Sequence, residues 1–456
     1  MAMQLRPHQT KAIEDLRAAY GAGYKAPVLV MGTGGGKTAT SSVIIRSAVA
    51  RGRRVWFMAH LREILDTTSA KLTAEGIDHG YIMAGRQYDP SPAVHVVMVQ
   101  TAARRLDKLP RPDLIVIDEC HLAVAATYRQ VVDAVGNPAL LGLTATPARL
   151  DGRGLVEMFD TLVQSCDTAQ LQADGLLVPI RYYAPSRPDL TGVRTIGGDY
   201  AQGQLANAMN KPSITGDAVA HYRKLAHGRP CVVFCTNVAH AHDTCAHFRE
   251  AGYRAVAISG ETATDERTGA LERLKGGELD VVVNCQLWVA GVDCPAIGCV
   301  ILLAPTKSLT KYLQSIGRGL RTHPGKTDLV VLDHAGNAFT HGLPTEAREW
   351  TLDGAKKRAR DAEAVEPVRQ CEHCYYVHAP APVCPNCGHV HPVKERKLRQ
   401  TEGELAELTE IKRKQRQEVG RAKTVEELTE IARQRGYRMG WVYQQLRIKS
   451  ARGIHL

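Results

Sequence analysis

Short runs of hydrophobic residues alternate with longer mixed segments over most of this 456-residue chain. Uninterrupted apolar runs of about four to eight residues are typical of strands buried on both faces of a parallel sheet, and the segments between them have helical spacing. One series of such runs lies between Pro27 and Pro147, and a second begins at Cys231. We therefore predict an α/β fold with two tandem domains, each built on a doubly wound parallel sheet. The predicted strands are Val28–Met31, Val55–Ala59, Val94–Gln100, Leu114–Asp118 and Leu140–Thr144 in the first domain, and Cys231–Cys235, Ala255–Ser259, Asp280–Asn284, Val300–Leu303 and Leu329–Leu332 in the second.

Domain boundaries follow from changes in this pattern. We assign residues 1–180 to the first domain and 216–345 to the second, with a connector at 181–215 that is rich in proline and poor in apolar runs. A small cysteine-containing module is predicted at 346–395. A basic, charged tail follows at 396–456, and we predict helices in it at 404–421 and 425–435.

Charge and cysteine usage restrict the class of protein. The formal net charge of +11 favours a polyanionic partner, although a solvated basic surface would give the same value. No apolar run approaches the roughly 20 residues of a membrane span, and the N-terminus lacks the apolar core of a signal peptide. Most of the twelve cysteines are scattered through predicted strands and helices, as in a reducing compartment. We predict a cytoplasmic protein without a membrane partner.

A glycine-rich loop at 31–38 follows the first strand and opens a helix. Such glycines let successive backbone N–H groups turn inward around phosphates, so Gly34 and Gly36 are predicted to bind nucleotide. Lys37 can reach the β and γ phosphates, and the Thr38 hydroxyl can bind Mg²⁺. The loop has Met31 at the first position of the usual G-x-x-x-x-G-K-[ST] pattern, and by itself it also fits ordinary turn chemistry.

Two adjacent carboxylates, Asp118 and Glu119, end another apolar strand about eighty residues later. Asp118 is predicted to hold Mg²⁺ and Glu119 to orient the attacking water. Taken alone, this pair could lie in a solvated loop. Because it follows the glycine-rich loop along the chain and both motifs come directly after apolar strands, the two together predict an ATP site. Because only the first domain has a phosphate loop, we expect the nucleotide to lie in a cleft between the two domains.

The second domain offers cations for that cleft. Residues 308–321 are predicted as a helix in which Gln314, Arg318 and Arg321 are spaced i, i+4, i+7 and share one face. Two arginines directed at the cleft are candidate arginine fingers that neutralise charge on the transferring phosphoryl group. A solvated basic helix face is the alternative.

Four cysteines form two C-x-x-C pairs separated by nine residues: Cys371 with Cys374, and Cys384 with Cys387. Four thiolates in tetrahedral array suit a structural Zn²⁺, and a closed Cys₄ site leaves no ligand position for chemistry. Disulfides are the alternative. Basic and aromatic residues nearby could follow a phosphate backbone and stack a base, or could be a solvated face beside a docking module. They are Lys356, Lys357, Arg358, Tyr375, Tyr376, Lys394, Arg396 and Lys397.

These residues together resemble the superfamily 2 helicases and translocases, which have two RecA-like domains; the resemblance covers about residues 4–335. It implies that Gln9, in Leu5-Arg6-Pro7-His8-Gln9, reads adenine, and that Asp118 to His121 form the D-E-x-H motif. Thr144 and Thr146 correspond to the motif that couples the ATP site to the strand, with His121 in the same coupling role. Gly291-Val292-Asp293 resembles the core of motif V, with Asp293 at the nucleotide. Residues 314–321 match the family pattern Q-x-x-G-R-x-x-R.

Shorter matches concern the nucleic acid. Residues 57–63 and 99–101 resemble the family motifs that contact its backbone, which makes His60, Arg62, Gln100 and Thr101 candidate contacts; a strand end followed by a helix start is the structural alternative. Residues 142–152, including Arg149, Asp151 and Gly152, resemble the branch with the bacterial RadD-like DNA-repair proteins and similar phage helicases. That branch acts mainly on DNA. Val289-Ala290 departs from the usual residues before motif V and leaves one phosphate contact open.

The sequence therefore predicts an ATP-dependent DNA helicase or translocase with ATP, Mg²⁺ and Zn²⁺ as cofactors. Single-stranded or branched DNA is the expected substrate, in repair or replication. A repair or replication protein could bind through the zinc module or the tail. Two other functions remain open: an ATP-switched nucleic-acid-binding or recruitment protein without strand separation, and an RNA helicase.

Overall fold

The structure is a computed structural model. It describes residues 5–122, 126–148, 154–185, 188, 190–196, 198–201, 204–205, 209, 212–285, 294–353, 368–392, 418–419, 422, 424–435, 437 and 439–451. The chain forms two compact units, residues 1–392 and 393–456. Within the described residues, no helix is long and apolar enough to cross a membrane.

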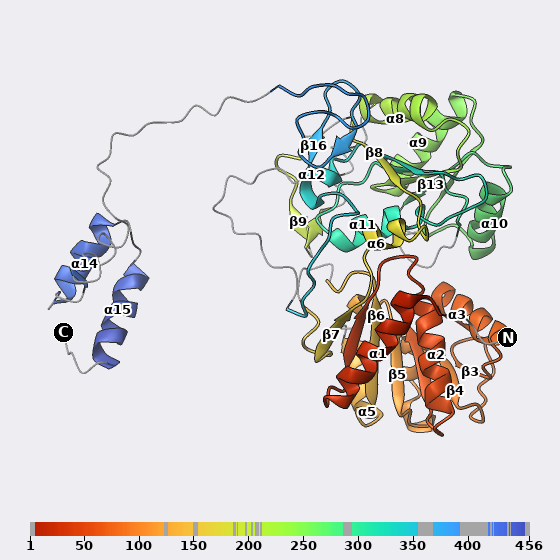
Figure 1. Cartoon of the computed structure of the whole chain (residues 1–456), viewed down its shortest axis with the longest axis horizontal. Coiled ribbons are helices and arrows are strands. Elements are labelled where there is room, and N and C mark those ends of the chain that lie inside the picture. Colours follow the sequence, from red (N-terminus) through yellow and green to blue (C-terminus); the bar gives the residue numbers. More distant parts are fainter. Residues whose placement is uncertain are drawn as a thin grey trace. The chain divides into compact units, whose positions relative to one another are not determined.

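The first sheet contains seven strands in the order β3-β4-β2-β5-β6-β1-β7, and every pairing is parallel (Figure 1). Its central strands are buried along their whole length, which explains their unbroken apolar sequences. The five predicted strands are confirmed, except that Val99 and Gln100, predicted as the end of the third, belong to helix α4. Two others, β3 and β7, are short or half-exposed and lack such a run. The strands are β1 (Pro27–Val30), β2 (Val55–Ala59), β3 (Gly80–Ile82), β4 (Val94–Met98), β5 (Leu114–Asp118), β6 (Ala139–Thr144) and β7 (Thr161–Gln164).

Helices cover both faces of the first sheet. On one face Leu16 and Ile45 pack with Leu29 and Phe57, and on the other Val131 packs with strand residues that alternate with these. The helices are α1 (Pro7–Gly21), α2 (Lys37–Val49), α3 (Arg62–Ala74), α4 (Val99–Ala103), α5 (Ala126–Ala134) and α6 (Thr168–Ala173), with short 3₁₀ turns η1 (Leu106–Lys108) and η2 (Cys120–Leu122).

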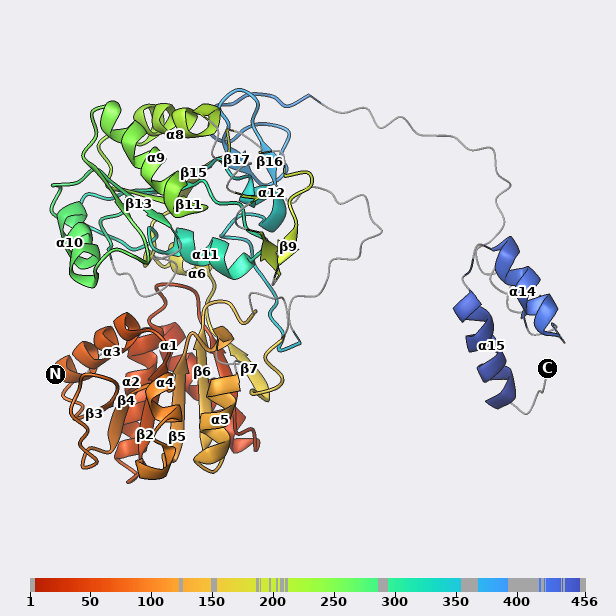
Figure 2. The ribbon, with the colours of Figure 1, turned by 180° about the vertical axis from the view of Figure 1, so that it is seen from behind.

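The second sheet has six parallel strands in the order β12-β13-β11-β14-β15-β8 (Figure 2). Strand β8 comes from the start of the predicted connector and pairs with β15 at the edge of the sheet. The connector prediction was therefore wrong for these residues. The strands are β8 (Ile180–Tyr183), β11 (Cys231–Cys235), β12 (Ala255–Ile258), β13 (Val281–Cys285), β14 (Cys299–Leu302) and β15 (Leu329–Asp333), and the helices α8 (Pro212–Leu225), α9 (Val238–Glu250), α10 (Thr264–Lys275), α11 (Leu309–Gly317) and α12 (Asn337–His341).

Three smaller elements complete the described chain. The segment predicted as a connector, 181–215, also contains a hairpin of β9 (Thr195–Ile196) and β10 (Asp199–Tyr200). The cysteine module contains the antiparallel pair β16 (Arg369–Gln370) and β17 (Val377–His378). In the tail unit, α14 (Val425–Gln434) and α15 (Met439–Ala451) pack around Leu428 and Val442. The predicted helix at 425–435 is thus present. The one predicted at 404–421 lies almost entirely outside the described residues.

Candidate active site

The glycine-rich loop connects β1 to α2, and its shape depends on glycine. Gly34 and Gly36 have φ values of 86° and 92°, in the left-handed region that side chains rarely adopt. A Cβ at Gly36 would also lie 2.2 Å from Nε2 of Gln9, and one at Gly34 would lie 2.6 Å from Cδ2 of Leu177. Helix α2 then begins at Lys37, so that its first N–H groups face the loop. This is the geometry of an anion-binding helix terminus.

Gln9 is buried in the first turn of α1 and braces this loop. Its Nε2 donates to the carbonyl of Gly35 at 3.0 Å, while its Oε1 accepts the N–H of Arg6 at 2.9 Å. His8 Nε2 also lies 2.9 Å from the Gly35 carbonyl. The His8 contact joins residues 27 positions apart and has no local sequence signal. The adenine-reading role of Gln9 stays a prediction.

The predicted metal and phosphate ligands converge at the carboxyl ends of the strands. Lys37 Nζ lies 3.5 Å from the carbonyl of Met31, and Thr38 is the next residue of α2. Asp118 ends β5, and its Oδ1 accepts the N–H of Glu119 at 2.9 Å. Burial, with the adjacent charge of Glu119, raises the pKa of Asp118 to about 6, while Lys37 and Arg318 act in the opposite direction. The site therefore holds a desolvated carboxylate close to cations.

Glu119 joins a hydrogen-bonded set that runs to the end of β6. The backbone of Glu119 is left-handed, with φ of 48°, which is strained for a residue with a side chain. Its Oε2 lies 3.4 Å from Nδ1 of His121, which is also 3.1 Å from Oγ1 of Thr144. Thr144 Oγ1 donates its proton to the carbonyl of Thr146 and accepts the N–H of that residue, both at 3.0 Å. His121 Nδ1 must therefore be the donor toward Thr144.

Helix α11 of the second domain contacts the loops of the first. Gln314 Nε2 donates to Glu119 Oε2 at 3.3 Å, and Thr310 Oγ1 donates to the carbonyl of Ala148 at 2.9 Å. A Cβ at Gly317 would lie 2.9 Å from Cγ2 of Thr33 in the phosphate loop. The expected cleft between the domains is thus lined from both sides.

The helix prediction for 308–321 was wrong at its C-terminal end, because α11 stops at Gly317. Glycines at 317 and 319 disfavour helix, and a Cβ at Gly319 would lie 2.5 Å from Cδ1 of Leu329. Arg321 therefore does not share a helix face with Gln314, whereas Arg318, the C-cap residue, still has helical backbone angles. Arg321 forms an isolated antiparallel bridge with Leu177. Burial lowers the pKa of Arg318, while the nearby carboxylates of Glu119 and Asp118 act in the opposite direction.

Lys326 holds the turn that carries the two arginines. Its Nζ donates to the carbonyls of Gly319, Arg321 and Pro295 at 2.6, 3.0 and 3.0 Å. Burial lowers the pKa of Lys326 to about 8. The contact partners come from three separate positions, so no sequence pattern indicates this role.

The four candidate nucleic-acid contacts are in different environments. In the parallel pairing of β2 with β5, Met58 lies opposite Ile117, and continuing this register places His60 level with Glu119. Burial lowers the pKa of His60. Arg62, at the start of α3, is exposed and pairs with Asp66 at 3.6 Å. On α4, Gln100 is exposed and Thr101 is half-buried.

Several predicted residues lie outside the described part of the chain. They are Asp293 with the rest of the motif V match, the departing pair Val289-Ala290, and Arg149, Asp151 and Gly152 of the branch-specific run. The same holds for Lys356, Lys357, Arg358, Lys394, Arg396 and Lys397 near the cysteine module.

The four clustered cysteines come together as a single site. Their Sγ atoms all lie within 4.8 Å of one another, and two pairs, Cys371 with Cys387 and Cys374 with Cys384, are 3.7 Å apart. A tetrahedral Zn²⁺ with Zn–S bonds of about 2.3 Å requires S···S distances of about 3.8 Å, whereas a disulfide requires about 2.0 Å. The donor set therefore fits zinc and excludes disulfides among these cysteines.

The two C-x-x-C segments have the same local shape. In one, the N–H of Tyr375 donates to the carbonyl of Cys371, and in the other the N–H of Gly388 donates to the carbonyl of Cys384, at 2.8 and 2.9 Å. The residue after the second cysteine is left-handed in both, with φ of 61° at Tyr375 and 73° at Gly388. This repetition makes two matched knuckles.

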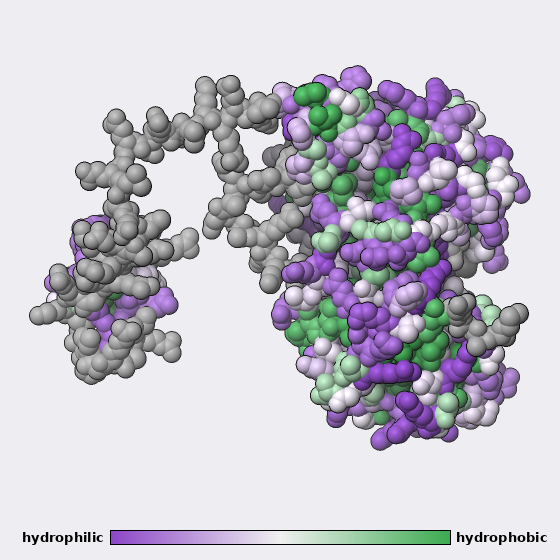
Figure 3. All heavy atoms as spheres, in the orientation of Figure 1, coloured by the Kyte–Doolittle hydropathy of each residue, from purple (hydrophilic) through white to green (hydrophobic). Residues whose placement is uncertain are grey.

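The cysteine module is docked on the second sheet. Tyr376 forms an antiparallel bridge with Tyr183 of β8, and their rings meet edge to face with centroids 5.5 Å apart. The N–H of Ala184 donates to the carbonyl of Tyr375 at 3.0 Å, and Val368 and Val377 join the main core. The half-buried Tyr376 is therefore part of this interface rather than a free stacking platform. Figure 3 shows a small hydrophobic patch on the module, where Val383 and Val390 are exposed.

The chain is similar to two known protein families and to a phage protein. Residues 2–149 match the family described as Type III restriction enzyme, res subunit, and residues 213–323 match the helicase conserved C-terminal domain. A 51.5 kDa protein of a Lactococcus phage (isolate 7-9) is 30% identical over 387 residues, which cover 84% of this chain and 82% of the phage protein.

The chain is also similar to a yeast protein and to a bacterial protein of known structure. IRC3 of Saccharomyces cerevisiae, named as a candidate ATP-dependent helicase, is 29% identical over 354 residues, 73% of this chain but only 51% of the yeast protein. A fragment of a Vibrio vulnificus YJ016 protein, titled as an HsdR subunit of a type I restriction enzyme, superposes with a TM-score of 0.60 at 22% identity and covers 74% of this chain and 65% of that one.

Two parallel-sheet domains, with a phosphate loop on one and a helix on the other that is followed by two arginines, define an ATP-hydrolysing enzyme. The chain belongs to the superfamily 2 helicases.

Proposed function

We propose that this protein is an ATP-dependent DNA helicase or translocase. The hydrogen bond from Gln314 to Glu119 carries the proposal, because it joins the second domain to the carboxylate that would orient water in the first. Binding of ATP between the phosphate loop and α11 closes the domains, and hydrolysis releases them. Repetition of this cycle moves the protein along a strand.

Each polar group of the site has a role in the proposed reaction. Lys37 neutralises the β and γ phosphates, and Thr38 with Asp118 holds Mg²⁺, which polarises the phosphoryl group when bound. Ionisation of Asp118 is then favoured by the metal charge. Glu119 orients the attacking water, with Gln314 and His121 fixing its carboxylate. Arg318 and Arg321 stabilise charge in the transition state.

Three observations support DNA as the polymer. The net charge of +11 suits a polyanion. The match over residues 2–149 is to a restriction-enzyme subunit family, and a restriction-enzyme subunit shares the fold. The branch resemblance favours DNA repair or replication in the cytoplasm. An RNA helicase and an ATP-switched recruitment protein are the competing functions.

The Cys₄ cluster is proposed to hold a structural Zn²⁺. The matched knuckles present all four thiols to one point, so the metal would fix the fold of residues 368–392. The exposed valines of this module and the tail unit are candidate surfaces for a repair or replication partner.

A strand-displacement assay beside ATPase measurements tests the proposal. Wild-type protein is expected to separate forked DNA, with ATPase stimulated more by single-stranded or forked DNA than by RNA. Lys37→Ala is expected to lose hydrolysis while retaining DNA binding, because the charge on the phosphates is removed without change to the DNA surface. Stimulation by RNA alone would favour the RNA helicase, and ATP-dependent changes in affinity without displacement or movement would favour the switched binder.

A further inference from the structure

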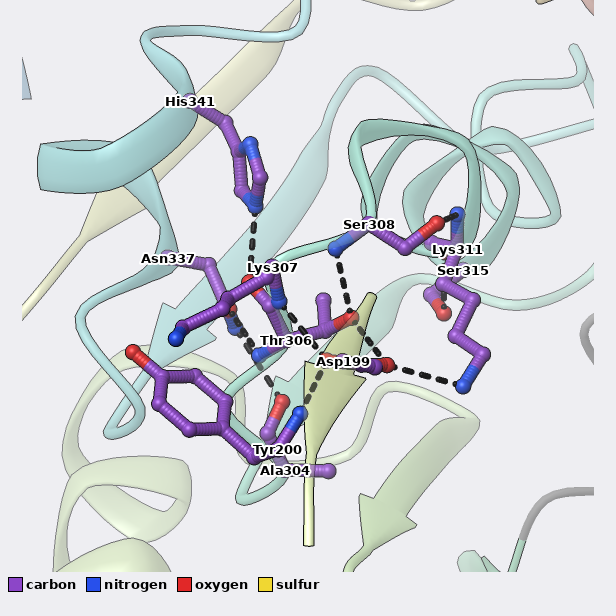
Figure 4. Close-up of polar contacts among 10 residues, drawn as sticks. All are labelled: Asp199, Tyr200, Ala304, Thr306, Lys307, Ser308, Lys311, Ser315, Asn337 and His341. Carbon is purple, nitrogen blue, oxygen red and sulfur yellow. Dashed lines mark hydrogen bonds and ion pairs between the residues drawn. The ribbon is translucent and has the colours of Figure 1, made fainter. Parts of the chain in front are cut away.

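The β9–β10 hairpin is fastened to the loop before α11 (Figure 4). Ile196 pairs with Asp199 and Thr195 with Tyr200 in the hairpin. Tyr200 packs with Leu205, Met209 and Ala335, so the segment has a small core of its own on the second domain. The hairpin is therefore an ordered insertion attached to the helix that reaches the ATP site.

Asp199 makes three of the polar contacts of this attachment, and Lys307 Nζ adds others by donating to Thr195 Oγ1 and lying 4.7 Å from the centroid of the Tyr200 ring. Its Oδ2 accepts from Thr306 Oγ1 and from Lys311 Nζ, both at 2.9 Å, and its Oδ1 accepts the N–H of Lys307 at 2.8 Å (Figure 4). Burial acts to raise the pKa of Asp199, but the bonds from Lys311, Lys307 and Thr306 outweigh it and lower the pKa. The carboxylate is thus ionised at neutral pH, where it holds Thr306 and Lys307 of the loop and Lys311 in the first turn of α11.

The same loop forms the N-terminus of α11. Ser308 is the N-cap, with its Oγ accepting the N–H of Lys311 at 3.3 Å, and its own N–H donates to Thr306 Oγ1 at 3.0 Å. On the other side of Thr306, the N–H donates to Asn337 Oδ1 at 3.0 Å and the carbonyl lies 2.8 Å from His341 Nε2. A negative charge at this end of the helix also complements its dipole.

The opposite half of α11 serves the ATP site. Gln314, less than two turns after Thr310, donates to Glu119, and Arg318 follows directly after the last helical residue. A nine-residue helix moves as a rigid rod, so a displacement of its N-terminus displaces Gln314 and Arg318 as well.

We propose that Asp199 is a positioning residue for ATP hydrolysis: it holds the N-terminus of α11 so that Gln314 and Arg318 meet the carboxylates of the first domain. This inference rests on the proposed function of those residues. A displacement of the hairpin would then move α11, and with it the Gln314 side chain that contacts the water-orienting carboxylate of Glu119.

The test compares ATPase kinetics of the full chain in Asp199→Ala and in a matched control, Asp280→Ala. Asp280 also accepts a backbone N–H, from Arg254 at 2.8 Å, and pairs with that arginine at 2.6 Å, but it lies before β13, which is next to the edge strand β12. Asp199→Ala is expected to lower kcat at least tenfold and to change KM for ATP less than about twofold, because the phosphate loop is intact. Asp199→Asn, which keeps the acceptor for Lys307, should recover part of the loss.

Asp280→Ala is expected to retain wild-type kcat even where its melting temperature falls as far as that of Asp199→Ala. Equal kcat in the two folded variants would overturn the positioning role, as would a loss in Asp199→Ala that appears only in KM. An inactive wild-type enzyme, or an active Lys37→Ala variant, would instead contradict the proposed ATP site itself, and the positioning role with it.

Discussion

The amide of Gln314 donates a hydrogen bond to the carboxylate of Glu119 across the junction of the two parallel-sheet domains, with 3.3 Å between Nε2 and Oε2. The same oxygen lies 3.4 Å from Nδ1 of His121, which is hydrogen-bonded to Thr144, a predicted coupling residue. Glu119 is thus the point at which the second domain meets the hydrogen-bonded set of the first.

Glu119→Gln is expected to bind ATP with near wild-type affinity and to lower kcat by about 10²-fold or more, because Asp118 and the phosphate loop are retained while the water loses its carboxylate. A fluorescent nucleotide titration and steady-state ATPase measure the two quantities. Glu63→Gln, at an exposed position in the first turn of α3, is the control and should leave both unchanged. If nucleotide affinity collapses instead, Glu119 is a metal ligand and the roles of the two acids are reversed.

Arg318→Ala is expected to lower kcat by about 10³-fold while ATP affinity changes only several-fold, since an arginine finger acts mainly on transition-state charge. Arg321→Ala should behave in the same direction. The control is Arg273→Ala, which removes an exposed arginine of α10 in the same domain. Weakened ATP binding with unchanged kcat would show that Arg318 acts on the ground state.

Asp118 should reduce the stability of the nucleotide-free protein at neutral pH. Its pKa is raised to about 6, so the folded state holds this proton more tightly than the unfolded state does. The resulting stabilisation is present below about pH 4 and is lost as pH rises to about 6. Asp118→Asn is therefore expected to raise the free energy of unfolding at pH 7.5 by about 1–3 kcal/mol, measured without Mg²⁺.

Asp113→Asn is expected to change the free energy of unfolding in the opposite direction. Asp113 lies directly before the same strand, β5. The pKa of Asp113 is lowered, chiefly by the N–H of Arg54, so its ionised form stabilises the fold at neutral pH. This variant should lose stability at pH 7.5. Equal effects of the two substitutions on denaturant midpoints would rule out the buried-charge cost at Asp118.

Replacing Cys384 and Cys387 by Ser should remove the metal and also lower the melting temperature of the second domain. Val368 and Val377 of the module are buried in the main core, and two such side chains contribute about 3 kcal/mol or more. Metal analysis and calorimetry measure the change. His373→Ala, an exposed histidine of the same module, should retain zinc; unchanged melting in a zinc-free variant would show that docking adds no stability.

The sequence was most informative where a segment carries its own signal. Strands such as Leu114–Asp118 are buried on both faces and were found from their apolar runs, and the phosphate loop and cysteine knuckles have fixed spacings. Strand β8 was missed because its partner β15 is nearly 150 residues away. Arg321 was placed on a helix because periodicity does not show that Gly319 packs against Leu329. The contacts of Asp199 and Lys326 depend on loops that only the tertiary fold brings together.

The docking of Tyr376 on Tyr183 has a further consequence for the protein in cells. Strand β8 is the last strand of its sheet, so its outer side has backbone groups open to pairing with another chain. The cysteine module occupies part of that side and would prevent edge-to-edge association of two molecules. If the module unfolds, this part of β8 becomes open to pairing, so self-association is an expected consequence of losing the cysteine cluster.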